Sequence, residues 1–208
     1  LVMCGDDVEI IIVNDGSTDK TAEIAKNYLK NNSNIKFIDK ENGGHGSGIN
    51  AGLKTCEGLY FKCVDSDDWI DHEAYEKLIK VIKENYNKNS NPDLYLTNYV
   101  YERIDINKSF CEDYLRKLVP HNCIFGWDKV KKMKMQQFLM MHSLIYKTSV
   151  IKQSNLNLPQ KTFYVDNIFA YVPLPYMKKI YYLDVNRRIT VNDKISGVKS
   201  ELNICLLS

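Results

Sequence analysis

The feature that most constrains this chain is an apolar run over residues 60–64 that ends in three carboxylates within four positions. The run reads Tyr-Phe-Lys-Cys-Val and is followed by Asp-Ser-Asp-Asp at 65–68. Side chains alternate along an extended chain, so Asp65 and Asp67 point the same way. Two such carboxylates repel each other unless a cation lies between them, and oxygen ligands suit Mg²⁺ or Mn²⁺. The stretch predicts a buried strand with a metal site at its end. The alternative is an acidic turn that caps the next helix through Asp68 or Asp71.

Two similar units precede this strand. Residues 8–13 are a continuous apolar, mostly β-branched run, which is typical of a strand buried on both faces. Residues 35–39 predict a second, shorter strand, and helices are expected after residue 19 and over 49–55. Two strand–loop–helix units followed by a third strand predict an α/β fold, with a doubly wound, mostly parallel but mixed sheet flanked by helices.

Each predicted strand ends in polar or glycine-rich chain. Asp15 lies in an Asn-Asp-Gly-Ser-Thr-Asp turn, and four glycines fall within residues 43–48. A loop of that kind brings backbone N–H groups close to a ligand. Ligands of open α/β sheets bind outside the carboxyl ends of the strands, so one crevice is expected to hold Asp15, the glycine loop, Asp65 and Asp67. The alternative for Asp15 is that it only stabilises its turn.

The second half has fewer clear patterns. Residues 93–101 predict another strand, whereas residues 103–135 show no clear period. An extended segment is expected over 140–146, and a late strand over 180–185. Asp166 follows an aromatic stretch, and one interpretation is that it caps a helix over 167–172.

Composition excludes several classes of protein. The 208 residues carry a net charge of +2, which argues against a general nucleic-acid binder. The six cysteines show neither zinc-ligand nor Cys-Xaa-Xaa-Cys spacing, which indicates a reducing, cytoplasmic compartment. No run of about 18 apolar residues and no signal peptide is visible. A lysine cluster over 129–134 is expected to be solvated surface, or to attract an anionic acceptor or the inner face of a membrane.

Taken together, the motifs resemble those of inverting family 2 glycosyltransferases. The segment Glu9–Asp19 is similar to the nucleotide-binding motif of that family, and Asn42–Gly52 to its second motif. Asp-Ser-Asp-Asp at 65–68 resembles the metal-binding Asp-Xaa-Asp, and Val-Asp-Asn at 165–167 resembles the later acidic motif, which more often reads Glu-Asp. The resemblance extends from residue 8 to about residue 190 and is closest to bacterial members that build cell-surface polysaccharides.

The resemblance implies a GT-A fold and a metal-dependent, inverting transfer of sugar. The expected donor is a nucleotide-sugar, a UDP-sugar in particular, and the expected acceptor is a hydroxyl of a glycan or polyol phosphate. The residues implied to contact the donor are Asp15, Gly44, Asn50 and Asp65. Asp65 and Asp67 would hold Mn²⁺ or Mg²⁺, and Asp166 would act as the catalytic base that deprotonates the acceptor.

The same resemblance divides the chain into two halves of one domain. Residues 1–101 would bind the nucleotide-sugar, and residues 102–208 would bind the acceptor. Members of the family normally begin with one more strand, whereas here only residues 1–7 precede the first matched motif. We therefore expect a fragment whose donor pocket lacks one wall.

Two other classes of protein remain open, and a third is disfavoured. Residues 46–51 match the Gly-Xaa-Gly-Xaa-Xaa-Ala of NAD(P)-dependent oxidoreductases, although residues 40–45 separate these glycines from the preceding strand. A non-catalytic binding domain derived from a transferase is a further alternative. A nucleotidyltransferase usually carries a basic, glycine-rich loop after its first strand, which this chain lacks.

Overall fold

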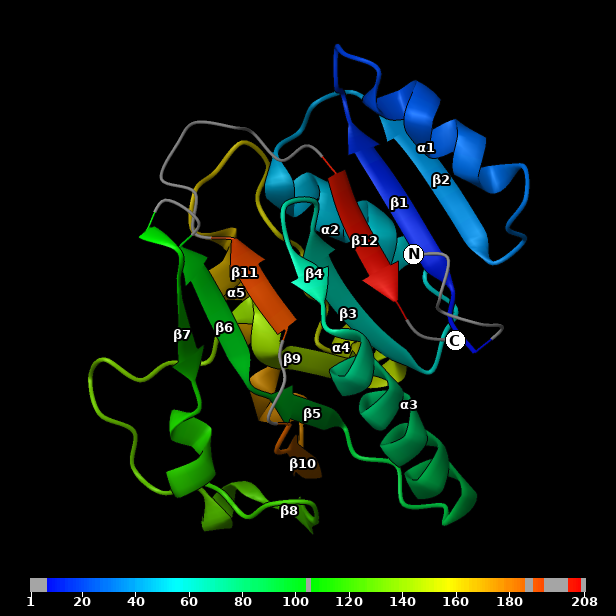
Figure 1. Cartoon of the computed structure of the whole chain (residues 1–208). Helices are drawn as coiled ribbons and strands as arrows, with labels where there is room; N and C mark the ends of the chain where they lie inside the picture. Colours follow the sequence, from blue (N-terminus) through cyan, green and yellow to red (C-terminus); the bar gives the residue numbers. More distant parts are fainter. Residues whose placement is uncertain (1–6, 104–105, 186–188, 193–201, 207–208) are drawn as a thin grey trace.

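The computed structural model describes residues 7–103, 106–185, 189–192 and 202–206. Within them, a large sheet of eight strands has the order β2-β1-β12-β3-β9-β5-β10-β8, and a small sheet has the order β4-β11-β6-β7 (Figure 1). The large sheet consists of β1 (Ile10–Asp15), β2 (Ile35–Lys40), β3 (Tyr60–Asp65), β5 (Leu94–Thr97), β8 (Ile124–Phe125), β9 (Leu144–Lys147), β10 (Ile180–Leu183) and β12 (Leu202–Leu206). The small sheet consists of β4 (Trp69–Ile70), β6 (Tyr99–Arg103), β7 (Lys108–Glu112) and β11 (Ile189–Asn192).

Helices cover both faces of the large sheet. The α-helices are α1 (Thr21–Leu29), α2 (His45–Thr55), α3 (His72–Asn87), α4 (Thr148–Gln153) and α5 (Val165–Tyr171). Short 3₁₀ turns are η2 (Tyr114–Lys117), η3 (Trp127–Lys129), η4 (Met141–Ser143) and η5 (Leu174–Tyr176). Side chains of α2, α4 and α5 share one core cluster, and side chains of α1 and α3 share the other. In β1, Ile11 belongs to the first cluster and Ile12 to the second, as alternation along a strand buried on both faces requires.

The sheet is mixed, and its strands alternate more in direction than a doubly wound parallel sheet would. β1 pairs with β2 in parallel, and β5 with β10 in parallel. β12 lies antiparallel between β1 and β3, and β9 lies antiparallel between β3 and β5. β1, β2, β3, β5 and β10 therefore share one direction, although β1 and β3 are not neighbours. Residues 1–6 lie outside the described residues, so the expected lack of one wall of the donor pocket stays a prediction.

Two element boundaries differ from the sequence-based expectation. α2 begins at His45, so the last two of the four glycines are helical rather than part of the loop. The strand expected over 93–101 divides at Asn98 into β5 and β6, which belong to different sheets. The Asn98 side chain is 1% exposed, donates to Asp184 Oδ1 and Val185 O at 3.1 Å each, and accepts from the Tyr182 hydroxyl at 2.6 Å. These bonds hold a buried amide at the end of β10, and the chain leaves the large sheet there.

No helix among the described residues is long and apolar enough to span a bilayer. Cys56 and Cys63 are buried, Cys111 and Cys123 are exposed, and none of these four side chains forms a disulfide.

Candidate active site

The polar ends of the first three strands meet at one edge of the large sheet. β1 ends at Asp15, β2 at Lys40 and β3 at Asp65, and all three strands run in the same direction. Asp15 contacts the glycine loop through Gly43 and Gly44, and His45 of that loop lies near Asp65. The structure therefore brings Asp15, the glycine loop and Asp65 to one edge of the sheet, and the ligand crevice expected there stays a prediction.

Asp15 holds the glycine loop in place. Its carboxylate is buried and accepts hydrogen bonds from Gly43 N at 3.0 Å and Gly44 N at 2.7 Å, and it forms an ion pair with Lys40. Gly44 has a φ of +83°, a conformation that L side chains rarely adopt. All three donors point at one carboxylate, so Asp15 determines the position of the loop from which α2 begins.

The Asn50 side chain forms hydrogen bonds with the segment that leads to Asp166. Asn50 Nδ2 donates to Leu158 O at 2.9 Å and to Asn157 Oδ1 at 3.1 Å, and Asn50 Oδ1 accepts from Leu158 N at 3.0 Å. The segment 157–162 lies over the glycine loop, where Lys161 N donates to Gly43 O at 2.8 Å. Residues of the expected second motif therefore bind and support the segment that precedes α5.

A group of three potential metal ligands lies at the end of β3. One ligand atom from each of Asp65, Asp68 and His142 lies within 4.8 Å of the other two. Asp68 Oδ2 is 3.1 Å from His142 Nδ1, and His45 Nε2 of the glycine loop is 3.8 Å from Asp65 Oδ1. Asp67, the second expected ligand, is exposed on the turn and is not a member of this group.

The donor atoms of this group suit a divalent cation. Asp65 Oδ1 and His142 Nδ1 are buried and make no hydrogen bond with the residues that the structure describes. Burial raises the pKa of Asp65, and the nearby His45 and His142 oppose that shift. Two carboxylates and one imidazole are a common ligand set for Mn²⁺ and related ions. A cation at this position would satisfy the buried atoms and offset the charge of the carboxylates.

The sequence predicted another role for Asp68. Asp68 was one of two candidates for the cap of α3, but Asp71 is the residue that caps it, accepting from Ala74 N at 3.0 Å. His142 comes 74 positions after Asp68, in an apolar segment that favours a core or acceptor-site histidine over a metal ligand, although the resemblance to GT-A enzymes leaves a late metal-binding histidine open. No local pattern joins the two residues.

Lys62 is a further charged residue beneath this group. It is fully buried on β3 and donates to His142 O at 2.7 Å, which fixes the turn η4 that carries His142. Burial lowers the pKa of Lys62 to about 8, whereas the nearby Cys63, Asp68 and Asp65 favour its charged form. The sequence contained a signal for this contact, a lysine inside the apolar run over 60–64, because a buried charged residue normally has a partner.

Asp166 lies in the first turn of α5, which begins at Val165. The interpretation of Asp166 as the N-cap of that helix is wrong, because Tyr164 occupies the capping position. The Asp166 side chain is half-buried, and α5 packs against α2 and against η4. Asp166 is thus carried by a helix that adjoins both the element with Asn50 and the turn with His142.

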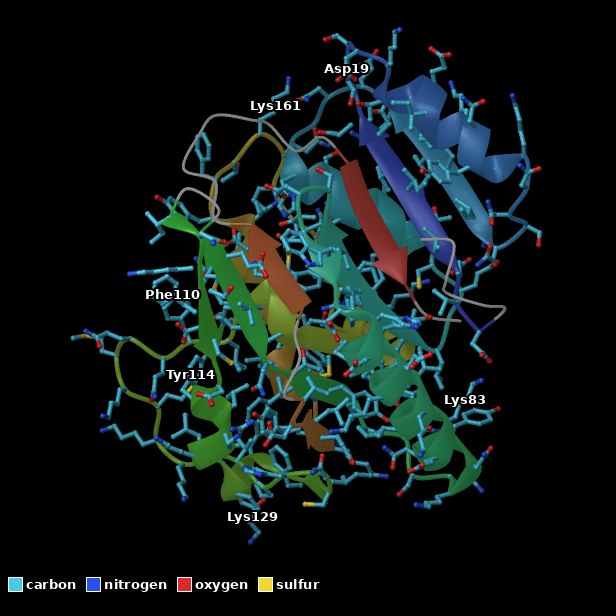
Figure 2. The ribbon with its side chains drawn as sticks, in the orientation of Figure 1. Asp19, Lys83, Phe110, Tyr114, Lys129 and Lys161 are labelled. Carbon is cyan, nitrogen blue, oxygen red and sulfur yellow. The ribbon has the colours of Figure 1, made fainter. Side chains whose placement is uncertain are left out.

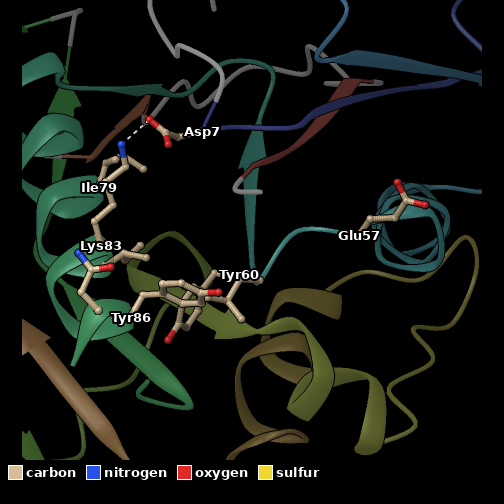
Figure 3. Close-up of a pocket in the computed structure, with 9 residues that line it drawn as sticks. Asp7, Glu57, Tyr60, Ile79, Lys83 and Tyr86 are labelled. Carbon is tan, nitrogen blue, oxygen red and sulfur yellow. Dashed lines mark hydrogen bonds and ion pairs between the residues drawn. The ribbon is translucent and has the colours of Figure 1, made fainter. Parts of the chain in front are cut away.

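A separate cavity lies away from this group of residues. It measures about 580 Å³ and lies where β3 begins, between Tyr60 and the α3 residues Ile79, Lys83 and Tyr86 (Figure 3). Lys83 Nζ and Asp7 Oδ2 form an ion pair of 2.6 Å at its edge. Because Asp65 is at the other end of β3, this cavity is separate from the candidate site.

Comparisons with known proteins report on the family and on the fold of this chain. The family model "Glycosyl transferase family 2" matches residues 3–151. The putative glycosyltransferase EpsH of Bacillus subtilis is 36% identical over 108 residues, which cover 52% of this chain and 30% of that protein. The glycosyltransferase GlyA of Streptococcus pneumoniae is 29% identical over 181 residues, which cover 79% of this chain and 26% of that protein. The chain thus spans less than a third of these relatives.

The fold has a solved counterpart. Staphylococcus aureus TarS 1–349, in a crystal structure in complex with UDP-GlcNAc, superposes with a TM-score of 0.70 at 22% identity. The match covers 92% of this chain and 51% of that one. At this identity the likeness concerns the fold.

Proposed function

Because the chain belongs to glycosyl transferase family 2 and has its GT-A fold, we propose that it transfers a sugar, with inversion, from a UDP-sugar to a hydroxyl of a glycan or polyol phosphate. One observation carries the proposal: the loop held by Asp15 and the group of Asp65, Asp68 and His142 lie at one edge of the sheet. That edge is where α/β sheets of this kind bind nucleotides.

The donor would lie against the first half of the chain, residues 1–101. TarS was crystallised with UDP-GlcNAc, which supports a UDP-sugar as the donor here. Asp65 would face the donor directly. Asp15 would act through the backbone of the glycine loop, because its carboxylate already bonds to Gly43 and Gly44. The Asn50 side chain bonds to the segment 157–158, so it would act on the proposed base rather than on the donor.

A divalent cation, Mn²⁺ or Mg²⁺, would be held by Asp65, Asp68 and His142, with Asp67 at the rim. When bound, the cation would offset the negative charge that develops on the leaving diphosphate. The protein contributes the rigidity of the ligand set, because Lys62 holds the backbone of His142 from below.

The acceptor would lie against residues 102–208, with Asp166 as the base. Inversion needs one proton acceptor on the face of the sugar opposite the leaving group, so no second carboxylate nucleophile is required. Asp166 would take the proton of the attacking hydroxyl at about 2.6–3.2 Å, the range in which proton transfer is efficient. Its place on α5, whose neighbours are α2 and η4, supports this role.

The proposed setting is the cytoplasm, at or near the inner face of the membrane. Lys129, Lys131, Lys132 and Lys134 are all exposed, which supports contact with an anionic acceptor or an anionic lipid surface.

Calorimetry of UDP binding tests the proposal. We expect wild-type protein to bind UDP in the presence of Mn²⁺ and to show no response to NADH. Asp65→Asn should weaken UDP binding with Mn²⁺ by at least about tenfold, or about 1.4 kcal/mol. The matched control is Asp71→Asn, because it removes the charge of a nearby carboxylate that caps α3, a role that asparagine also fills. Tight NADH binding without a response to UDP and Mn²⁺ would instead support an oxidoreductase.

Turnover separates a transferase from a non-catalytic binding domain. A thermal-shift screen of nucleotide-sugars, with and without Mn²⁺, would select the donor. UDP release from that donor should fall in Asp166→Asn, while UDP binding stays unchanged. If wild-type protein binds the donor but releases no UDP with any acceptor preparation, the catalytic role is lost.

A further inference from the structure

Two neighbouring aromatic side chains project into solvent just before Asp166. Phe163 is 88% exposed and Tyr164 is 78% exposed. Single exposed aromatic residues are common on protein surfaces, but adjacent ones at a candidate site indicate a binding surface. Neither the fold nor the proposed donor site uses these two rings.

The backbone that carries the rings is held at both ends. Lys161 N donates to Gly43 O at 2.8 Å, and Asn167 N donates to Tyr164 O at 3.2 Å. A Cβ on Gly44 would lie 3.0 Å from Lys161 N, so the segment also packs closely on the glycine loop. The rings are therefore presented by a defined piece of backbone.

Part of that backbone is in an unfavourable conformation. Lys161 has a φ of +51° and Tyr164 a φ of +62°, in the left-handed region where non-glycine residues are uncommon. Such residues persist where the surrounding structure imposes them, and they gather at functional sites. A glycine at 164 would remove the strain, but it would also remove the ring.

The segment borders the candidate site. It runs beside the start of α2 (Figure 1), and Lys161 lies at the same edge of the molecule as Asp19 in the loop after β1 (Figure 2). Asp166 follows two residues after Tyr164, and its helix adjoins the turn that carries His142. The two rings are therefore carried by the chain that leads directly into the helix of the proposed base.

We propose that Phe163 and Tyr164 form a stacking platform for a pyranose ring of the acceptor. The proposal rests on the proposed function and narrows its acceptor to a glycan. The face of an aromatic ring is electron-rich and apolar, so it suits the C–H face of a sugar. A polyol phosphate would need several cations, and Lys161 is the single basic residue within 157–167.

Saturation-transfer NMR on the 208-residue chain with UDP and Mn²⁺ tests this platform. The probes are methyl β-D-glucopyranoside and methyl N-acetyl-β-D-glucosaminide. We expect wild-type protein to saturate the ring protons of at least one probe, and Phe163→Ala or Tyr164→Ala to weaken its binding about tenfold. Tyr164→Phe should retain binding. Tyr86→Ala removes an exposed ring on α3, by the separate cavity, and is the matched control.

A second variant separates binding from folding. Tyr164→Gly should raise the thermal midpoint, because it relieves the left-handed strain, and should still lose the sugar. Calorimetry with UDP and Mn²⁺ on the same samples reports on the donor site alone. If the wild-type protein does not bind UDP in that experiment, the result contradicts the proposed function and not the platform.

Three results would overturn the platform. The first is a wild-type protein that binds neither pyranoside, or binds them equally well after both alanine substitutions. The second is binding of sn-glycerol 3-phosphate that Lys161→Met abolishes and Phe163→Ala does not change. The third is binding to phosphatidylglycerol vesicles that depends on both rings, since that would make them a membrane contact.

Discussion

Asn50 holds both backbone polar groups of Leu158 with one side chain. Its Oδ1 accepts from Leu158 N at 3.0 Å, and its Nδ2 donates to Leu158 O at 2.9 Å. The two residues are 108 positions apart, one on α2 and the other on the segment that leads to Asp166. This pair therefore connects the glycine loop, where the donor is proposed to bind, to the proposed base.

Replacing Asn50 should loosen the segment without damaging donor binding. Asn50→Ala leaves two backbone groups of Leu158 without their partner, which costs about 1–3 kcal/mol of unfolding free energy. We expect faster amide hydrogen exchange at Leu158 and Lys161, a lower kcat for UDP release and unchanged UDP affinity. Asn34→Ala is the control, because Asn34 Nδ2 also bonds to backbone, at Val8 O, near the start of β1. Unchanged kcat despite faster exchange would show that the segment does not position the base.

The sequence predicted the parts of the site that follow from local pattern. Apolar runs ending in polar residues predicted β1, β2 and β3, and the carboxyl-end rule then brought Asp15, Gly44 and Asp65 together. The roles of these residues remain predictions. The pairing of Asp68 with His142, and of Asn50 with Leu158, joins positions that no local period relates, so sequence alone did not reveal them.

In the fold, too, local pattern predicted the strands but not the contacts between distant segments. Residues 93–101 have the composition of one strand, but the buried amide of Asn98 bonds to the end of β10 and divides them between two sheets. The antiparallel β12 between β1 and β3 was likewise not predicted, because strand order depends on pairing between distant segments.

Asp67 and Asp68 are competing candidates for the second carboxylate ligand of the metal site. Alternation along an extended chain assigned Asp67, whereas the structure groups Asp68 with Asp65 and His142. We expect Asp68→Asn to weaken Mn²⁺ binding at least about tenfold, and Asp67→Asn to weaken it about twofold or less. Calorimetric titration of Mn²⁺ with saturating UDP measures both affinities. The reverse order would restore Asp67 as the ligand and would place the turn differently when the ion is bound.

Asp184 should make the fold sensitive to acid. Burial alone would raise the pKa of Asp184, but hydrogen bonds from Arg116 and Asn98 outweigh burial and hold the pKa below its ordinary value. A lowered folded-state pKa stabilises the protein above the unfolded-state pKa of about 3.9, and the stabilisation is lost as the pH falls through the folded-state value. Arg116 is 39% exposed, so solvent screening limits the effect to roughly 1 kcal/mol.

Urea unfolding at two pH values measures this contribution. Asp184→Asn should be less stable than wild type by roughly 1 kcal/mol at pH 7, and the difference should shrink at pH 3. Asp128→Asn removes an exposed carboxylate that pairs with the neighbouring Lys129, so it should change stability little at either pH. A difference that is constant from pH 7 to pH 3 would show that the carboxylate's charge contributes nothing.

Two glycines allow the contact beneath the Asp166 segment to be tested by adding one methyl group. A Cβ on Gly46 would lie 2.8 Å from both Leu158 Cβ and Pro159 O, and a Cβ on Gly126 would lie 2.8 Å from Asp128 Oδ1. The first contact involves held backbone, whereas the second involves the end of an exposed side chain that can rotate away. The clash in Gly46→Ala should therefore destabilise the protein by about 1–3 kcal/mol. The higher helix propensity of alanine would offset up to about 1 kcal/mol of that loss. The substitution should also lower kcat, because it displaces the segment that leads to Asp166. Gly126→Ala should stay within about 0.5 kcal/mol of wild type at full kcat. Urea unfolding and UDP release measure both effects. If the two substitutions had equal effects, the segment would not pack closely against α2.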